Sequence, residues 1–433
     1  MIPRLVWRRR SAAAAGIYAS AALGIAGTVV AARVLGVAGF GVFAVALATA
    51  GFFQVLLDLT VEESLTKYGF RYVTNEDWGR LRRLFRKALQ LKLLGGLLAT
   101  LVLLLLAPAA DTLFDSDGLL GPMLAVAALP LVQAPENVAS TALLLRSRYD
   151  VRGWLQAVSM GLRLTAIAVG TQLGVTETMV GLVTAQAVAT VVTGWIGWKA
   201  FRRFPAEPER PLAEDRADVR TFVAYSSAAT GMIALRTTLA PLLLGVVSNA
   251  TQVGLLRVAQ APQTGLTSLS SPVRLILLTE QTRDWELGDR HGVLRGVRRY
   301  TAVGTGLMIV AVPVFLVLMP WLVRLVFGSE YTGAVDAARI ALVAAAIHFA
   351  YGWTKSLPVS IGRPNLRILS HGLETAVLLP LTAVFGAAWG VTGAAVAFLL
   401  SSVVFAAVWT VLLVRIQGSA TQPVRPPEGA LVP

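Results

Sequence analysis

The sequence predicts an all-α polytopic membrane protein, with about twelve transmembrane helices in two six-helix pseudo-symmetric lobes. The first observation behind this prediction is composition: 55% of the 433 residues are hydrophobic and 14% are charged, whereas a soluble domain carries about 25% charged residues. The second is that apolar runs of roughly 20 residues, long enough to cross a bilayer, recur from end to end. The third is that lysines and arginines collect in alternate connections between these runs. Cysteine is absent, which excludes disulfides and thiolate metal sites.

The apolar runs predict the transmembrane helices in order along the chain. They cover residues 12–35, 40–66, 88–107, 119–145, 152–173, 177–199, 219–245, 251–279, 296–326, 332–357, 365–386 and 389–415. The first run follows a basic segment, as in a signal peptide, but it extends beyond Val30 and is too long for the apolar region of such a peptide. We therefore expect an uncleaved first helix.

The charges of the connections predict the orientation of the chain. Connections on one side hold most of the lysines and arginines. Those on the other side hold none and carry acidic residues, namely Asp111, Asp115, Asp117, Glu177 and Glu330. By the positive-inside rule both termini are cytoplasmic, and the richness in alanine and arginine points to a bacterial inner (plasma) membrane. The net charge of +14 then reflects orientation and contact with anionic membrane lipid, not a nucleic-acid partner.

Three segments outside the spans have distinct compositions. Residues 76–90 predict a basic amphipathic helix lying on the inner leaflet. The side chains expected to face lipid are Trp78, Leu81, Leu84, Phe85 and Leu89. Residues 201–218 are rich in proline and charge and predict a cytoplasmic linker, and residues 417–433 predict a disordered cytoplasmic tail.

Two pairs of similar segments indicate an internal repeat. Residues 33–46 are echoed by residues 242–259, and residues 173–189 by residues 389–404. Both offsets are close to half the length of the chain. Because each half holds six helices, the repeat is parallel, about an axis along the membrane normal. We predict an N-terminal lobe over 1–200 and a C-terminal lobe over 219–416.

The helix predicted over 40–66 contains acidic residues. Asp58 and Glu62 are four residues apart and share one helical face. A carboxylate at the bilayer centre costs about 2.5 kcal/mol or more, but 1.5 Å per residue from Phe40 places Asp58 about 27 Å along the axis, near the cytoplasmic boundary. One interpretation is a structural ion pair with Lys67, Arg71 or a basic residue of another connection. The other is a proton or cation site, or a gate whose pairs break as the lobes move.

Residues 32–69 resemble the first two helices of the polysaccharide-unit flippases in the multidrug/oligosaccharidyl-lipid/polysaccharide (MOP) exporter superfamily. The residues that fit its two segments are Arg33, Gly36, Gly41, Phe43, Asp58, Leu59, Leu65, Lys67 and Tyr68. Thr60 departs from the pattern, which usually has glycine there. The resemblance extends to the twelve helices and to the last helix. It implies a MATE-like fold and the export of lipid-linked sugar intermediates by alternating access between the lobes.

Five arginines within the predicted spans are candidate ligands for the diphosphate of a polyprenyl-linked substrate: Arg33, Arg163, Arg236, Arg257 and Arg339. Arginines at lipid depth require a wet cavity or acidic partners, and the guanidinium fork suits a pair of phosphate oxygens. The alternative is helix-to-helix salt bridging; for the set we favour the cavity. Lys92, Arg274 and Arg324 lie near helix ends, where snorkelling accounts for them.

No phosphate-binding loop of the Walker type is present, so ATP hydrolysis in this chain is not expected. We expect no cofactor or metal, and coupling to a Na⁺ or H⁺ gradient. The candidate coupling or gating residues are Asp58, Glu62, Glu136, His348 and Glu374, with His371 one turn before Glu374. The expected partners are the lipid-linked oligosaccharide, membrane lipid and glycan-assembly enzymes, and the protein is expected to be a monomer.

Two other functions were weighed. A drug/cation antiporter of the same superfamily is the main alternative, but its lobe interior is expected to be more acidic and aromatic. A membrane glycosyltransferase or polymerase is less favoured. The DSD sequence at residues 115–117 mimics a metal and sugar-nucleotide motif, but it falls on the predicted outer face, whereas sugar nucleotides are cytosolic.

Overall fold

The computed structural model describes residues 2–57, 59–266, 277, 281, 284–285, 287, 289–361, 363 and 365–420, and the side chains of 2–10, 229, 233 and 417–420 are not described. Asp58 and Arg274, which the sequence singled out, lie outside the described residues, as does most of the predicted tail. Every regular element in the described part is helical. The predicted all-α class is therefore confirmed.

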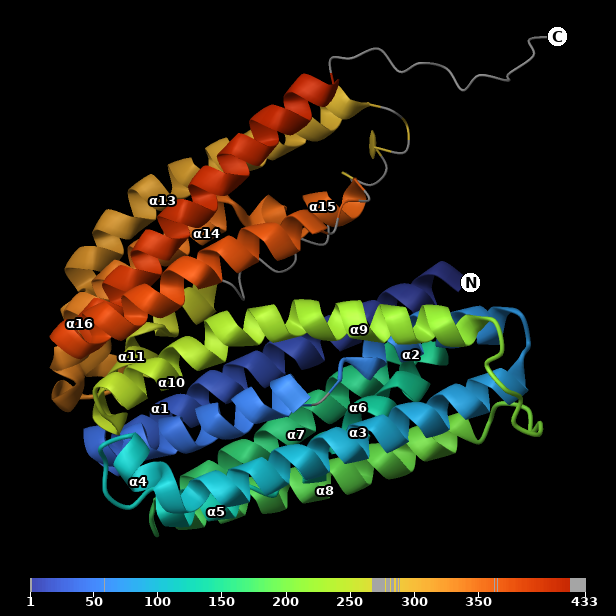
Figure 1. The fold of residues 1–433 in the computed structure, drawn as a ribbon, viewed down its shortest axis with the longest axis horizontal. Coiled ribbons are helices and arrows are strands. Elements are labelled where there is room, and N and C mark those ends of the chain that lie inside the picture. Colours follow the sequence, from blue (N-terminus) through green and yellow to red (C-terminus); the bar gives the residue numbers. More distant parts are fainter. Residues whose placement is uncertain are drawn as a thin grey trace. The chain divides into compact units, whose positions relative to one another are not determined.

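The chain forms two compact units, one of Met1–Val258 with Val323–Gly333 and one of Ala259–Leu322 with Ala334–Pro433. The helices of unit 1 are α1 (Ile2–Leu57), α2 (Val61–Thr74), α3 (Trp78–Leu106), α4 (Ala110–Leu113), α5 (Leu120–Val126), α6 (Leu129–Leu145), α7 (Tyr149–Gly170), α8 (Val175–Phe201), α9 (Asp215–Ala234), α10 (Ala240–Val247) and α11 (Ala250–Ala259). The other helices are α13 (Arg290–Val326), which ends in unit 1, and α14 (Val335–Ala350), α15 (Leu357–Ser360) and α16 (Asn365–Ala420) of unit 2. Figure 1 labels them along the chain. The lobe boundary predicted at residues 201–218 stays a prediction.

Seven helices of the described part are long and apolar enough to cross a membrane. The long helix α16 contains the last two predicted spans, and α1 contains the first span and the second as far as Leu57; each of the two helices is kinked at a glycine. Gly36 has φ 67° and Gly390 has φ 56°, a backbone region that glycine adopts at little cost. Gly174, the predicted counterpart of Gly390 in the repeat, also has a positive φ, of 146°. Both equivalent positions thus interrupt the helical path at a glycine with positive φ, although their ψ angles differ (178° at Gly174 and −133° at Gly390).

Small residues hold the helices of unit 1 close together. A Cβ on Gly16 of α1 would lie 2.4 Å from the backbone of Gly153 in α7, and a Cβ on Gly197 of α8 would lie 2.4 Å from the Ala139 oxygen of α6. Such positions accept only glycine, and small residues are the usual means of helix association in membranes. The helices α3, α6, α7 and α8 consequently pack side by side (Figure 1).

The prediction that residues 76–90 form a separate helix on the membrane surface is wrong. Residues from Trp78 onward form the start of the single long helix α3, which Asp77 begins by accepting a hydrogen bond from the Arg80 amide at 3.2 Å. Leu81 and Leu84 are buried in a core with residues of α2, α6 and α9. Most of this apolar face therefore packs against protein, whereas Leu89 is 37% exposed.

Unit 2 has its own core, to which α13, the turn Gly352–Lys355, α15 and α16 contribute. Trp353, Phe405 and Trp409 are almost fully buried there. The indole nitrogen of Trp353 donates to the hydroxyl of Thr301 at 2.9 Å, which satisfies a polar group that burial would otherwise leave without a partner.

Candidate functional site

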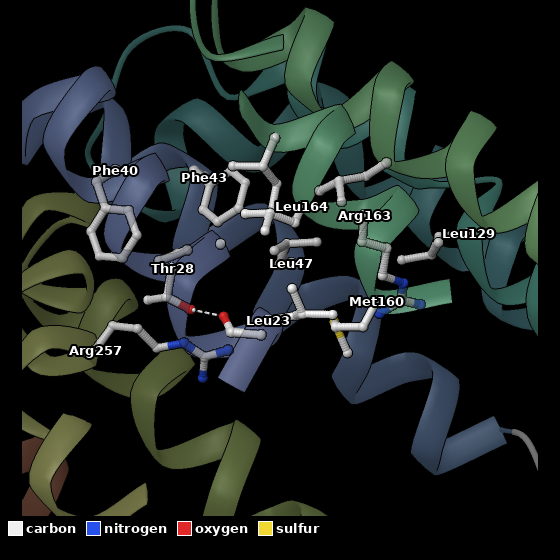
Figure 2. A pocket seen from close by; sticks show the side chains of 15 residues that line it. Leu23, Thr28, Phe40, Phe43, Leu47, Leu129, Met160, Arg163, Leu164 and Arg257 are labelled. Carbon is white, nitrogen blue, oxygen red and sulfur yellow. Dashed lines mark hydrogen bonds between the residues drawn. The ribbon is translucent and has the colours of Figure 1, made fainter. Parts of the chain in front are cut away.

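A cavity of about 140 Å³ lies within unit 1 between α1, α7 and α11. Its walls are mostly apolar, with Leu23, Phe43 and Leu47 among them. Figure 2 shows Arg257 from α11 and Arg163 from α7 entering from opposite sides of these residues. Both charged side chains that line the cavity are thus arginines.

Close glycine contacts bring α11 against α1 and so position Arg257. A Cβ on Gly41 would lie 2.5 Å from the Ala250 oxygen, and a Cβ on Gly254 would lie 3.0 Å from the Gly41 Cα. Neither position has room for a side chain. Gly254 is three residues before Arg257, so this contact holds the arginine one turn along α11, at the cavity.

Arg257 is the open charge of the site. Its side chain is exposed, and within the described part of the chain its guanidinium forms no hydrogen bond or ion pair. The hydroxyl of Thr28, which also lines the cavity, bonds to the Gly24 oxygen of its own helix at 3.1 Å. The five donors of this guanidinium are therefore available to an anionic ligand.

Arg163 is held by a polar network across three helices. Its Nε donates to the side-chain oxygen of Gln186 in α8 at 3.1 Å. One of its terminal nitrogens donates to the side-chain oxygen of Gln133 in α6 at 3.5 Å. The Gln186 amide in turn donates to the Glu136 carboxylate and, at 3.0 Å, to the Thr190 hydroxyl. Glu136, predicted as a coupling residue, thus reaches Arg163 through a fully buried glutamine.

A second, more polar cavity of about 230 Å³ adjoins this network. Gln133, Glu136, Arg152 and Gln186 line it, and Arg163 lines both cavities. Arg163 therefore lies between a mostly apolar cavity and a more polar one. A proton or ligand that alters the Glu136–Gln186 contact would also alter the orientation of Arg163.

Arg33 and Arg339 satisfy backbone carbonyls. Arg33 donates to the Leu325 oxygen and, at 2.8 Å, to the Val326 oxygen, where the unpaired carbonyls of the last turn of α13 attract a cation. Arg339 donates to the Leu316 oxygen at 3.0 Å, a carbonyl that lost its helical partner because Pro320 has no amide hydrogen. In this structure both guanidinium groups bind the backbone.

Other predicted residues lie away from the cavity. Arg236 is half-buried in the π-helical turn Leu235–Leu239 between α9 and α10, and it does not line the cavity of Arg257. Lys92 does not snorkel as predicted, because it is 1% exposed and its Nζ lies 2.7 Å from the Glu62 carboxylate. Glu62 thus has the structural ion pair that one interpretation expected, but with a lysine of α3.

A buried carboxylate lies between two histidines in unit 2. Glu374 of α16 is fully buried, with one oxygen 3.1 Å from His348 Nε2 of α14 and the other 3.2 Å from His371 Nδ1. The ring of Phe405 stacks on the imidazole of His371 and lies tilted against that of His348. The predicted one-turn pairing of His371 with Glu374 is present, and His348 joins it from the neighbouring helix.

The two glutamines of the network were not among the residues predicted from the sequence. Gln133 is three residues before Glu136, and Gln186 is four residues before Thr190, so each shares a helical face with another polar residue. This spacing was the available signal. It was overlooked because uncharged amides do not stand out in an apolar helix.

Comparisons with known proteins agree with this architecture. The family model described as polysaccharide biosynthesis protein matches residues 6–274. No curated protein matches the chain in sequence. An inward-facing multidrug resistance MATE family transporter of the MOP superfamily is 12% identical, with a TM-score of 0.72 over 92% of this chain and 95% of that one.

Two further solved structures are similar in fold. The lipid II flippase MurJ in an inward closed conformation is 11% identical, with a TM-score of 0.69 over 94% of this chain and 90% of that one. A MOP superfamily transporter from Pyrococcus furiosus is 15% identical, with a TM-score of 0.60 over 96% of both chains. The predicted resemblance to MOP exporters is confirmed at the level of the fold.

Proposed function

Because the chain belongs to the polysaccharide biosynthesis protein family, we propose that it flips a polyprenyl-diphosphate-linked oligosaccharide from the inner to the outer leaflet of a bacterial inner membrane. Transport proceeds by alternating access between two lobes, with both termini cytoplasmic. Family membership supports a role in glycan assembly, and the fold shared with MOP transporters supports transport.

The open guanidinium of Arg257 carries the proposal for the substrate. It faces a cavity without an acidic partner among the described residues, and Arg163 approaches from the opposite side (Figure 2). A diphosphate offers several acceptor oxygens, which an arginine binds in pairs. The apolar wall admits the lipid-proximal part of the substrate, while the bulk of the polyprenyl chain stays in the bilayer.

The charge of the cavity argues against a cationic drug as substrate. A cationic drug would be a third positive charge beside Arg257 and Arg163, and it would be repelled within a mostly apolar space, where charges are weakly screened. Glu136 is the nearest acid of the network, but its carboxylate accepts a hydrogen bond from Gln186. The cavity therefore suits an anion better than a cation.

Coupling in this proposal is assigned to ionisable groups that have partners in the lobe interiors. Glu136 reaches Arg163 through Gln186, and Glu374 binds two histidines. Either carboxylate could take up a proton and change its hydrogen bonds as the transporter cycles. Glu62, which pairs with Lys92, is assigned a structural role.

Flipping in proteoliposomes tests the proposal. A fluorescent polyprenyl-diphosphate oligosaccharide is placed in both leaflets, and a membrane-impermeant quencher reports how much of it reaches the outer leaflet. We expect faster exchange than in protein-free vesicles and none of a cationic dye in a parallel efflux assay. Dye efflux without movement of the lipid-linked sugar would overturn the proposal in favour of the drug/cation antiporter.

A further inference from the structure

A groove of about 430 Å³ runs between α3, α6 and α8 of unit 1 and shares no lining residue with the two cavities described above. Ala139 and Ala142 of α6 form its floor, and their small side chains leave the space open. Phe85 of α3 forms one wall and Trp198 of α8 the other. The groove is thus apolar along most of its length.

The helices on both sides of the groove carry exposed apolar side chains. Leu94 of α3 is 53% exposed, and Val191 and Trp195 of α8 are 70% and 57% exposed. In a membrane protein such rows face lipid tails, because they have no other apolar surroundings. The groove therefore opens toward the acyl chains of the bilayer.

One end of the groove is basic. Arg82 and Arg86 line it together with Glu209, and Glu209 binds Arg86 at 2.8 Å and the neighbouring Arg83 at 3.3 Å. Arg82 stacks on the Phe201 ring, 5.7 Å from its centroid, and donates to the Pro205 oxygen at 3.2 Å. One carboxylate among three guanidinium groups leaves this end with a net positive charge.

We propose that the groove binds one anionic phospholipid, independently of the transported substrate. The phosphate lies at Arg82 and Arg86, and the first part of an acyl chain lies on Ala139 and Ala142. From Arg82 to Leu89 the groove follows α3 for about 10 Å at 1.5 Å per residue. It therefore takes the headgroup end of the lipid, and the remaining chain continues into the bilayer.

The charge of the groove favours an anionic headgroup over a zwitterionic one. Choline would place a third cation beside Arg82 and Arg86, whereas glycerol adds no charge. Glu209 of the segment between α8 and α9 competes with the phosphate for Arg86. The lipid phosphate thus replaces Glu209 as the partner of Arg86. Binding of the lipid therefore loosens the contact of the segment between α8 and α9 with α3.

Lipid retention by the purified full-length protein tests the proposal. Native mass spectrometry counts bound phosphatidylglycerol and phosphatidylcholine of identical acyl chains, each added alone. We expect preferential retention of phosphatidylglycerol, reduced by about fivefold per arginine in the Arg82→Gln and Arg86→Gln variants. Glu209→Gln is expected to raise retention, because it removes the competing charge.

Two glycine substitutions separate the groove from non-specific binding. A Cβ on Gly194, which lines the groove, and a Cβ on Gly161 of α7 each meet nothing within 4 Å. Gly194→Leu is expected to fill the groove and reduce retention, whereas Gly161→Leu is the matched control and is expected to retain phosphatidylglycerol normally. Equal retention of both phospholipids, normal retention by Gly194→Leu, or retention of polyprenyl phosphate alone would each overturn the proposal. The arginine variants leave the floor of the groove intact. If Gly194→Leu fails to fold, phospholipid retention by these variants still tests the proposal.

Discussion

Arg257 in unit 1 and Glu374 in unit 2 are ionisable side chains in opposite situations. Arg257 is exposed to a cavity and has no partner among the described residues. Glu374 is fully buried, and both of its oxygens lie against histidines. A charge that is open to a cavity can bind a ligand, whereas an enclosed charge can respond chiefly by gaining or losing a proton. The comparison thus matches the two proposed roles, which are substrate binding for Arg257 and coupling for Glu374.

Removing the open charge is expected to have the largest effect on transport. Arg257→Ala loses charge-assisted hydrogen bonds to phosphate, which lowers substrate affinity by about ten- to hundredfold. Arg257→Lys is expected to recover little, because an ammonium group lacks the bidentate fork. Flipping of the fluorescent lipid-linked oligosaccharide is the measurement, with Arg339→Ala as the control, since that arginine binds a backbone carbonyl. Flipping by Arg257→Ala at the wild-type rate would contradict the proposed binding of the diphosphate by Arg257.

The distinction between Arg257 and Arg33 could not be predicted from the sequence. Both lie in glycine-rich segments toward one end of a predicted helix, and the sequence suggested the same role for them. What separates them is a contact over 293 residues, which brings the end of α13 to Arg33. Local patterns do not show which carbonyls a distant proline or helix terminus leaves unpaired.

The helical class and the one-turn spacing of His371 and Glu374 were accessible from the sequence, because each depends on local periodicity. The surroundings of residues 76–90 were not. An amphipathic pattern shows that one face is apolar but not whether lipid or protein covers it. Lys92 illustrates the same limit, since a lysine near a helix end can snorkel or pair, and only its neighbours decide.

The ion pair of Glu62 and Lys92 is expected to affect stability instead of substrate binding. Glu62→Gln leaves a buried lysine without this partner, at a cost of about 2 kcal/mol, below the 3–5 kcal/mol of a fully buried pair because Glu62 is partly exposed. A lower melting temperature and lower abundance should follow, with flipping per molecule unchanged. Glu62→Gln combined with Lys92→Met should recover much of the loss. A Glu62→Gln variant that melts like the wild type but fails to flip would move this residue to the coupling group.

Neutralising Glu374 tests the proposed coupling role of the buried carboxylate in unit 2. In the proposed coupling, Glu374 takes up and releases a proton as the transporter cycles. Initial flipping rates of the wild type should therefore change by several-fold between assays at about pH 5.5 and 8.5, and those of Glu374→Gln by less than about twofold. Substrate affinity should stay unchanged, because Glu374 does not line the cavity of Arg257. A flat profile in the wild type would exclude proton coupling through this cluster.

Arg339 provides the smallest and most selective test, because it is a membrane arginine with an evident structural task. Its guanidinium satisfies the Leu316 carbonyl, which Pro320 leaves without a helical partner, and it also pairs with Asp336 at 3.2 Å. Arg339→Met removes one hydrogen bond and a partly exposed ion pair, so we expect a loss of about 1 kcal/mol in stability.

The companion change Pro320→Ala restores an amide to the same carbonyl and should make the arginine dispensable. Thermal melting of the two single variants and the double variant measures this coupling. Additive losses in melting temperature would contradict the role of Arg339 as the partner of that carbonyl, and a loss of flipping in Arg339→Met at full abundance would return it to the substrate-binding arginines.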